Sequence, residues 1–557
     1  METAACSELV RSLLAKRGVT EEKEIDDFLH PKYELHTHDP FLMEGMERAV
    51  VRVFAAMAAG ERIAVYADFD CDGIPGASVL SDFFAKIGYA NVEVYLPHRD
   101  REGYGFHVDA IAALASRGVS LIITVDVGTT AVEQVACAKE KGVDVIVTDH
   151  HEIVSALPSA VAILNPKLPH YPFPHLCGAG VAYKLVQALL IEGRKRSDAR
   201  FIAIPEGWEK WLLDLVAIAT VADMVPLVGE NRVLAYFGLQ VLRKSRRPGI
   251  DAICNRLRLR KSELTEDDIG FSIAPRVNAA SRMDEPMLAF HLLTTSDVDE
   301  AEKIAAELES LNTKRKSVVA AIVRDAKKHA RTRFSESDRV IVLGNTTWKP
   351  ALLGLAANSL MQERGGVVCL WGRDANGKLK GSCRSDESAS IVALFTSVSA
   401  HLEQFGGHER SGGFSVSHEE VHTLHEVFAR ALPDVGERIA KDATQSDALL
   451  ALSEIGIPLY ADVIRLAPFG SSNPKPVFRV PRVTVMSVKA FGKEKNHVEV
   501  TLADGSYRMR AFDFFRTADD FTHMPREGEC ATVIATIERD TFRGGLALRL
   551  VDVLGEA

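Results

Sequence analysis

The sequence predicts an α/β protein with a doubly wound parallel-sheet domain, a long connecting helix, a second smaller α/β domain and a C-terminal OB-type β-barrel. Three observations predict this order. Apolar runs rich in Val and Ile alternate with helix-like stretches over residues 62–166, a proline-free amphipathic pattern fills residues 296–331, and five short strand-like segments follow residue 478. A chain of 557 residues has room for about three or four domains, each with its own core.

Five apolar runs form the first predicted sheet. They lack the alternation of apolar and polar residues that a strand with one wet face shows, so we expect parallel strands covered by helices on both faces. The longer segments between the runs suit crossover helices. The runs are RIAVYADFD, VEVYLP, SLIITVD, VDVIVTD and AVAILNP.

The rest of the chain divides into three parts. Residues 167–290 read mostly as helix, and the amphipathic pattern after them suits a helix that joins two domains. A second α/β pattern runs from RVIVLGN through GGVVCLW and KLKGSCRS to about residue 435. The last five strands, from RVTVMSVKAFG to GLALRLVDVL, fit a small barrel. The predicted domains are therefore 1–290, 291–334 (the connecting helix), 335–440 and 441–557.

The composition is that of a soluble globular protein, with 47% hydrophobic and 25% charged residues. The eight cysteines are scattered without a CxxC pair, so we expect no disulfide framework, no zinc cage and a reducing interior. No segment approaches a membrane span and the N-terminus lacks a signal-like core, which predicts a cytoplasmic protein. The net charge of −10 argues against a nucleic-acid partner, unless bound metal ions hold the polyanion.

Acidic and histidine side chains follow the ends of the predicted parallel strands. Asp68, Asp70 and Asp72 follow the first strand, Asp126 follows the third, and Asp149, His150 and His151 follow the fourth. In an open α/β sheet, ligands bind in the crevice outside these strand ends. Carboxylates crowded together repel one another unless cations intervene, and oxygen and imidazole ligands suit Mn²⁺ or Mg²⁺.

Each motif also has an ordinary structural alternative. A single strand-end Asp is often a helix cap or a turn former, and a histidine pair is usually a surface feature. Asp223, in the apolar segment VADMVPL, is either a further ligand or a helix-end cap, because a buried Asp is rare unless it is paired or metal-bound. The set as a whole favours a divalent-metal site, since an unpaired acidic cluster would be costly as structure alone.

The ordered motifs resemble a known family. DFDCDG, VDVG, TDHHE and VADMVPL are similar to the motifs of the DHH phosphoesterase superfamily. HRDREGYG, PRVNAASRM, GSCRS, FGGHERSGGF and APFGSSNPKPVF resemble, in the same order, those of the RecJ-type single-stranded-DNA-specific exonucleases. The resemblance runs from about residue 40 to the C-terminus. It implies a monomeric 5′-to-3′ exonuclease that degrades single-stranded DNA to mononucleotides in DNA repair and recombination, with a single-stranded-DNA-binding protein and a helicase as partners.

The resemblance also implies a cofactor and its ligands. In DHH enzymes two divalent cations, Mn²⁺ by preference or Mg²⁺, are held at these positions. Carried over, the ligands are Asp70, Asp72, Asp126, His150 and Asp223, with Asp126 bridging both ions and Asp68 a less secure ligand. His151 would face the scissile phosphate, and Asp149 would orient the histidines. Two such ions can activate a shared water, so no covalent nucleophile is required.

Substrate contacts follow from the same resemblance. Arg99, Ser382 and Arg384 would grip a terminal 5′-phosphate, for which the planar Arg fork is suited. The positions implied to lie near the DNA backbone or a nucleotide are Arg276, Asn278, Arg282, Gly406, Gly407 and His408. Any one Arg has surface salt bridging as its alternative. In the barrel, Lys489, Phe491, Lys493, Arg510, Phe512, Phe514 and Arg516 either bind single-stranded DNA or, for the phenylalanines, fill a core.

Two other functions stay open. The first is a DHH phosphodiesterase for short oligoribonucleotides or cyclic dinucleotides, but such proteins generally lack the barrel. The second is a non-catalytic Cdc45-like replication scaffold, which would have lost metal ligands that this chain retains. The chain departs from the RecJ pattern at Pro75 and Gly76, at Ser281 and at Ser411–Gly413; none of these positions is a proposed ligand.

Overall fold

The computed structural model describes residues 6–153, 156–283, 285–335, 337–432, 445–492, 495–540 and 543–555. The chain forms two compact units. The larger contains His38–Val225 and Phe237–Ala440, and the smaller contains Met1–Thr37, Pro226–Tyr236 and Lys441–Ala557. The predicted domain boundaries stay predictions, but the structure groups the N-terminal segment with the C-terminal part of the chain rather than with the first sheet.

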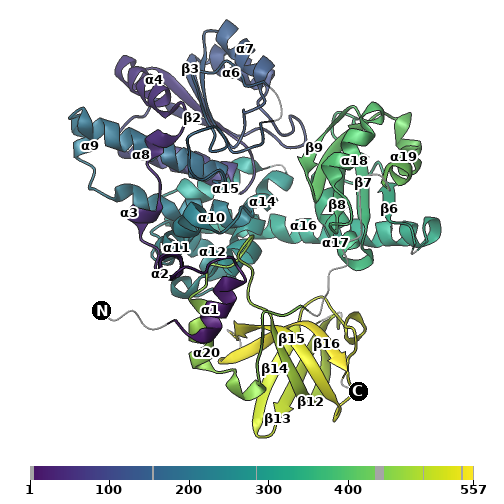
Figure 1. Ribbon diagram of the computed structural model, residues 1–557. Helices are drawn as coiled ribbons and strands as arrows, with labels where there is room; N and C mark the ends of the chain where they lie inside the picture. The colour runs from purple at the N-terminus through teal and green to yellow at the C-terminus, as the bar shows by residue number, and fades with distance from the viewer. Residues whose placement is uncertain are drawn as a thin grey trace. The chain divides into compact units, whose positions relative to one another are not determined.

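The first sheet of the larger unit is parallel, as predicted. Its strands are β1 (Arg62–Ala67), β2 (Val92–Tyr95), β3 (Val119–Val125), β4 (Asp144–Thr148) and β5 (Ala162–Leu164), in the order β2-β1-β3-β4-β5 (Figure 1). The strand order reverses between β1 and β3. This switch point leaves a crevice outside the carboxyl ends of those two strands, where a ligand can bind.

Helices cover both faces of this sheet, which confirms the doubly wound architecture. Helices α6 (Val108–Ser116) and α7 (Val132–Glu140) share an apolar core with Tyr66 of β1 and Ile122 of β3. Helices α4 (Met46–Ala59), α5 (Gly73–Lys86) and α8 (Gly178–Lys195) pack against the opposite face (Figure 1). Strands β1, β3 and β4 are therefore almost wholly buried, which explains their apolar runs, whereas the edge strand β2 is half-buried.

A helical region follows, as predicted, and ends in the long connecting helix. Its helices are α9 (Ala199–Ile202), α10 (Leu213–Ala222), α11 (Gly229–Arg243), α12 (Pro248–Leu257), α13 (Glu266–Asp268), α14 (Ala274–Arg282), α15 (Pro286–Thr294) and α16 (Val298–Arg333). The side chain of Asp297 caps α16 by accepting from the Glu300 amide at 2.9 Å. With no proline after this cap, α16 continues for 36 residues and leads into the second sheet.

The second sheet has the strand order β6-β7-β8-β10-β9. Its strands are β6 (Val340–Gly344), β7 (Val367–Arg373), β8 (Leu379–Ser385), β9 (Gln404–His408) and β10 (Ser411–Val416), and its helices are α17 (Pro350–Arg364), α18 (Ile391–Ser397) and α19 (Leu424–Ala431). The glycine-rich FGGHERSGGF forms the β9–β10 hairpin. Gly407 has φ +147°, and a Cβ there would lie 2.3 Å from the Ser411 carbonyl oxygen, so the close pairing of the hairpin needs glycine at this position.

The expectation that the cysteines form no disulfide framework does not hold for one pair. Cys369 of β7 and Cys383 of β8 lie directly opposite each other and form a disulfide. The bond results from strand register, which two cysteines separated by 14 residues do not reveal in the sequence. Cys6, Cys71, Cys137, Cys177 and Cys254 are free thiols.

The smaller unit contains the predicted barrel. Its five strands are β12 (Phe478–Phe491), β13 (His497–Asp504), β14 (Tyr507–Asp513), β15 (Cys530–Arg539) and β16 (Leu546–Gly555). They run in the order β12-β13-β14-β16-β15, and a β12–β15 pairing closes the barrel (Figure 1). The five expected strands are therefore confirmed. A further short strand, β11 (Ala448–Leu449), pairs with β12 beside the barrel.

The N-terminal helices belong to this unit because their apolar faces bury in the barrel's core. Val10, Leu13 and Leu14 share one hydrophobic cluster with Val480 and Leu502. The unit's helices are α1 (Glu8–Ala15), α2 (Glu22–Leu29), α3 (Tyr33–His36) and α20 (Ile457–Ile464).

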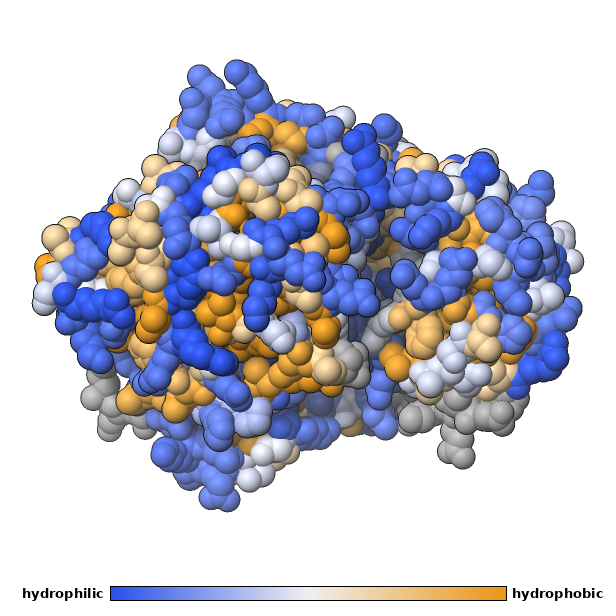
Figure 2. Space-filling view, turned by 90° about the horizontal axis from the view of Figure 1, so that it is seen from above, coloured by the Kyte–Doolittle hydropathy of each residue, from blue (hydrophilic) through white to orange (hydrophobic). Residues whose placement is uncertain are grey.

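The molecular surface carries both hydrophilic and apolar residues. Figure 2 shows one face on which apolar patches lie between charged and polar groups. Over the described ranges, the structure has no helix with the length and apolar character needed to cross a bilayer.

Candidate active site

The acidic and histidine side chains at the strand ends converge at the switch point. Three groups of potential ligand atoms each lie within 4.8 Å of one another: Asp68, Asp70 and Asp126; Asp72, His150 and Asp223; and Asp126, His150 and His151. Asp126 and His150 each belong to two groups, so the three groups form one continuous cluster. These groups contain seven of the eight predicted metal and catalytic residues. The eighth, Asp149, contacts both histidines, so all eight lie in this region.

Asp126 sits at the centre of the cluster in a strained conformation. Its φ is +60°, which is uncommon for a residue other than glycine, and its amide donates to the Thr148 carbonyl at 2.9 Å. The residue is 3% exposed, and Oδ1 of its carboxylate lies 3.2 Å from Nε2 of His150 but has no hydrogen-bond donor among the described residues. Burial, followed by the charge of Asp72, raises its pKa well above the ordinary value. A bound cation would relieve this cost.

Asp72 is held by the start of α8. Its carboxylate oxygens accept from the Gly178 amide at 2.6 Å and from the Ala179 amide at 2.7 Å. These amides form the positive end of an 18-residue helix. Burial and the neighbouring Asp70 nevertheless raise the pKa of Asp72 to about 7. The orientation of this carboxylate is therefore fixed by backbone amides that lie far from it in the sequence.

Gly178 is a site residue that sequence reasoning missed. A Cβ at this position would lie 2.6 Å from Cβ of Asp126 and 2.9 Å from its Cα. Only glycine lets the helix approach closely enough to bond Asp72 while Asp126 stands beside it. The signal that could have found it is the small-residue start of the helical segment CGAGVAYKL.

The other two aspartates of the first motif differ in their surroundings. Oδ1 of Asp70 accepts from the Asp72 amide at 2.8 Å and from the Gly73 amide at 3.2 Å. Asp68 is 4% exposed, and its Oδ1 finds no donor in the described part of the chain. Burial and the charge of Asp70 raise the pKa of Asp68 well above the ordinary value. Asp68 thus shares with Asp126 a buried oxygen that a cation would satisfy.

The adjacent histidines are placed for different tasks by Asp149. This buried carboxylate accepts from the His150 amide at 2.8 Å and lies 2.7 Å from Nδ1 of His151. Burial lowers the pKa of His150 to about 3, which leaves a neutral ring able to bind a cation. For His151 burial acts in the same direction, but the bond to Asp149 outweighs it and raises the pKa to about 9. His151 therefore holds a proton near neutral pH.

Tyr104 was not predicted as a site residue. Its hydroxyl lies 3.3 Å from the ring nitrogens of His151, and the tyrosine of the motif HRDREGYG was the available signal. Asp223 is the C-cap residue of α10, and its Oδ2 lies 3.6 Å from Nε2 of His150. The two alternatives for Asp223 are thus compatible, because the residue ends a helix and also faces the cluster.

Three predicted arginines have no carboxylate partner in the part of the chain that the structure describes. The guanidinium of Arg99 lies over the Phe69 ring at 4.7 Å, Arg282 donates to the Ala351 carbonyl at 2.6 Å, and Arg384 donates to the Cys383 carbonyl at 2.7 Å. Within the described ranges none of the three forms an ion pair. Burial and the charges of Arg99 and other nearby arginines lower the pKa of Arg282. Unpaired guanidinium groups of this kind attract an anion.

The space for Arg384 is built into α17. A Cβ at Gly354 would lie 2.6 Å from Nη2 of Arg384, so a larger residue there would displace the guanidinium. Ser382 lies two residues earlier on β8, on the same face of the strand as Arg384. The pairing of Ser382 with Arg384 as one anion-binding group remains a prediction.

Two residues of PRVNAASRM make contacts within the protein. Arg276 is 7% exposed, pairs with Glu309 at 2.6 Å and donates to the Ser272 carbonyl. Asn278 accepts from the Cys71 amide at 3.1 Å, so it supports the loop that carries the first aspartates. Their predicted contacts with DNA remain predictions.

Two of the departures from the family pattern lie in packed positions. Ser281 is fully buried, and Gly76 allows close packing, since a Cβ there would lie 2.5 Å from Val125.

The glycine-rich hairpin presents its residues to solvent. Gly406, Gly407 and His408 are all exposed on β9. Although solvent reaches His408, neighbouring groups partly desolvate its ring, and this loss of hydration together with the charge of His151 lowers its pKa. His408 therefore lies within electrostatic reach of the acidic and histidine cluster.

The barrel residues divide between the two alternatives. Phe512 is 7% exposed and belongs to the interior, whereas Phe514 is 40% exposed and contacts the rings of Phe491 and His497. Arg510 pairs with two acidic groups, and Arg516 donates to the Val551 carbonyl. Lys489 is exposed, and Lys493 lies outside the described residues.

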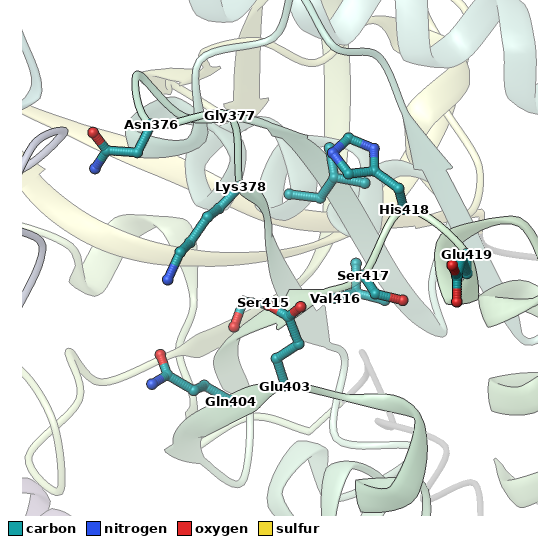
Figure 3. A pocket seen from close by; sticks show the side chains of 11 residues that line it. Asn376, Gly377, Lys378, Glu403, Gln404, Ser415, Val416, Ser417, His418 and Glu419 are labelled. Carbon is teal, nitrogen blue, oxygen red and sulfur yellow. The ribbon is translucent and has the colours of Figure 1, made fainter.

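A separate hollow of about 660 Å³ lies beside the second sheet. It is lined by residues 376–379, 403–404 and 415–419, and Figure 3 shows Lys378, Glu403 and His418 around it. None of the predicted site residues lines it. Its lining contains both a cationic and an anionic side chain, Lys378 and Glu403, whereas the acidic and histidine cluster consists of groups that can all bind a cation.

Three family models match successive parts of the chain. They are the DHH family N-terminal domain over residues 62–220, the DHHA1 domain over 337–434 and the RecJ OB domain over 446–551. The single-stranded-DNA-specific exonuclease RecJ of Haemophilus influenzae is 31% identical over 98% of this chain and 95% of its own length. This chain belongs to the RecJ family.

Further comparisons agree with this assignment. RecJ of Bacillus subtilis is 35% identical over 91% of this chain, which spans 63% of that longer relative. A crystal structure of RecJ from Thermus thermophilus with Mn²⁺ superposes with a TM-score of 0.80 at 24% identity, covering 98% of this chain and 76% of that one. A structure of exonuclease RecJ bound to manganese gives 0.60 at 29% identity, covering 70% and 95%. The predicted fold class, with its two α/β domains and OB barrel, is confirmed.

Proposed function

We propose that this chain is a metal-dependent exonuclease that hydrolyses single-stranded DNA from the 5′ end to mononucleotides. The observation that carries the proposal is the continuous cluster of carboxylate and imidazole ligands at the switch point, with buried oxygens of Asp68 and Asp126 that lack donors among the described residues. Relatives named single-stranded-DNA-specific exonucleases, and a family structure bound to manganese, support the same reaction class.

The residues of the cluster fit a pair of divalent cations. Asp68, Asp70, Asp72, Asp126, His150 and Asp223 would hold them, with Asp126 shared. Bound Mn²⁺ or Mg²⁺ would lower the pKa of a water molecule and neutralise phosphoryl oxygens. His150 suits a ligand because it is neutral, and Asp72 suits one because the amides of α8 hold it in place before any ion binds.

His151 acts on the substrate rather than on a cation. Its proton is kept by the bond to Asp149, so the ring donates a hydrogen bond to an oxygen of the scissile phosphate. Water oxygen bonds to phosphorus while the bond from phosphorus to the 3′ oxygen of the first nucleotide breaks. The products are a mononucleotide and a strand with a new 5′-phosphate.

Polarity comes from an anion site for the 5′ end. Arg99, Ser382 and Arg384 would bind the terminal phosphate, and the absence of carboxylate partners for both arginines within the described chain supports this role. Arg276, Asn278, Arg282, Gly406, Gly407 and His408 would line the path of the strand. The barrel, through Phe491 and Phe514, would stack bases of the single strand.

We place this activity in the cytoplasm, in DNA repair and recombination, with a single-stranded-DNA-binding protein and a helicase as partners of a monomeric enzyme. The RecJ OB domain match over residues 446–551 favours a long polymer over the oligoribonucleotide or cyclic-dinucleotide alternative. The complete ligand set disfavours the non-catalytic scaffold.

End-labelled single strands test the proposal. With Mn²⁺, a 5′-labelled strand should release labelled mononucleotide first, while a 3′-labelled strand should shorten gradually. Asp126→Ala should abolish release, and Asp299→Ala, an exposed carboxylate on α16, should leave it unchanged. First release of mononucleotide from the 3′ end would refute the polarity, and activity confined to short RNA would support the phosphodiesterase alternative.

A further inference from the structure

The connecting helix α16 carries polar groups that the site described above does not use. Asn312 is fully buried, and neither of its side-chain polar atoms has a hydrogen-bond partner in the described residues. Arg315, one turn later, has a buried Nε that also lacks a partner within those residues. Unsatisfied buried groups are rare and costly in a folded protein, so this pair calls for a ligand.

The stripe that contains these two residues faces the predicted DNA-binding helix. Glu309, Asn312 and Arg315 follow one another at three-residue spacing, so each is a neighbour of the next on the surface of α16 and Asn312 lies between the other two. Glu309 pairs with Arg276 of α14 at 2.6 Å, and α14 packs on α16. The stripe therefore meets the helix that also carries Arg282.

Charge in this region is predominantly positive. The charge of Arg315 is one of the influences that lower the pKa of Arg282, and the charge of Arg276 likewise lowers that of Arg315 after burial. Arg276 is neutralised by Glu309, but Arg282 and Arg315 form no ion pair within the described chain. Like charges held together in a part-buried site are stabilised when an anion binds between them.

We propose that Arg315, supported by the Asn312 amide, forms with Arg282 a subsite for an internal phosphate of the single strand. The connecting helix is then a wall of the DNA path as well as a joint between domains. This inference rests on the proposed function for the identity of the anion. Arg315 is a binding residue, and it would act on strand affinity rather than on the bond that breaks.

Binding measurements in Asp126→Asn protein, in which hydrolysis should be more than about a hundredfold slower, isolate this subsite. Adding Arg315→Met should weaken binding of a 5′-phosphorylated oligodeoxythymidine of 12 nucleotides by about tenfold and reduce the slope of log affinity against log salt by about 0.7, the value for one single-strand phosphate. Lys303→Met, which removes an exposed charge elsewhere on α16, should do neither. Arg315→Lys should recover most of the affinity.

A 5′-phosphorylated dinucleotide provides the second arm. Its terminal phosphate would occupy the 5′-end site and its internal phosphate is the scissile one, so no further phosphate remains for the subsite on α16. Arg315→Met should therefore leave its hydrolysis rate in otherwise wild-type protein unchanged. Equal losses for the dinucleotide and the long strand, or wild-type affinity and salt slope in the variant, would overturn the inference. Failure of the proposed function would look different, because the wild-type protein would then hydrolyse neither substrate.

Asn312→Leu separates a ligand role from a structural one. Leucine keeps the branched arrangement of heavy atoms and removes two polar atoms that lack partners among the described residues, so the thermal midpoint should stay level or rise, while strand affinity falls. A lower midpoint with unchanged strand affinity would make Asn312 structural and would remove it from the subsite.

Discussion

Replacing Gly178 with alanine should separate metal binding from the rest of the fold. The added Cβ would lie 2.6 Å from Cβ of Asp126, whereas carbon atoms in ordinary contact are about 3.5–4.0 Å apart. The start of α8 or the Asp126 loop must therefore move by about 1 Å. A shift of that size lengthens the amide bonds to Asp72, now 2.6 and 2.7 Å, beyond the useful range.

The expected cost has two parts. Overpacking a buried contact costs about 1–3 kcal/mol, and a weakened hydrogen bond to a carboxylate costs about 1.5–3 kcal/mol. Gly178→Ala should therefore reduce the affinity for Mn²⁺ by about 10–100-fold, as loss of a group that orients a ligand does. Titration calorimetry with Mn²⁺ measures this change, and thermal unfolding of the metal-free protein measures the packing cost.

Gly180→Ala is the matched control. It adds the same methyl group two residues later on α8, but its nearest neighbour, Cβ of Leu176, lies at an ordinary 3.5 Å. This variant should bind Mn²⁺ like the wild type and unfold at the same temperature or slightly higher. If Gly178→Ala also bound Mn²⁺ with unchanged affinity, the reasoning that α8 positions Asp72 would be refuted.

Three other predictions concern charge and packing. Asp126→Asn should lower exonuclease activity by more than about a hundredfold yet raise the thermal midpoint of the metal-free protein, since it removes a buried carboxylate that lacks a donor within the described residues; a lower midpoint would contradict this. The pKa of Asp72 is raised from an ordinary 3.8 to about 7 in the fold, so the folded protein binds a proton that the unfolded chain releases. The free energy of unfolding in EDTA should therefore fall as pH rises from about 4 through 7, and added Mn²⁺ should flatten that slope. Arg232→Met in the smaller unit should cost about 3 kcal/mol in denaturant unfolding, because Arg232 is 3% exposed and donates to the carbonyls of Phe28, Leu466 and Ala467; a cost below about 1 kcal/mol would refute it.

The parts of the site that could be predicted depend on local sequence. Buried parallel strands appear as Val- and Ile-rich runs, and the residues that end them stand at the carboxyl edge by geometry alone. For this reason the positions of Asp70, Asp126 and His150 along the chain are enough to predict that they meet in one crevice. The reversal of strand order between β1 and β3 then puts the first motif, which follows β1, beside the second, which follows β3.

The parts that could not be predicted depend on contacts between distant segments. Gly178 reaches Asp72 across 106 residues, and helix α1 packs into a barrel that begins at residue 478. The bond between Cys369 and Cys383 follows from strand register. Periodicity reports which face of an element is apolar, but it does not report which partner covers that face.

The same limit explains why the functional residues violate local rules. Asp126 adopts φ +60° and keeps a buried oxygen without a donor among the described residues, and the pKa of the neighbouring Asp72 is raised to about 7. Each feature costs stability in the protein alone, and natural sequences keep such features where function requires them. Here all of these features lie in one crevice, and a positive charge placed among the carboxylates would stabilise them together. Arg315 and Asn312 show the converse pattern, since their Nε and Nδ2 donors lack partners among the described residues and negative charge would satisfy them. A metal-assisted reaction on a polyanion needs a place for cations and a place for phosphates. The acidic and histidine cluster would take the cations, and the subsite on α16 would take a phosphate.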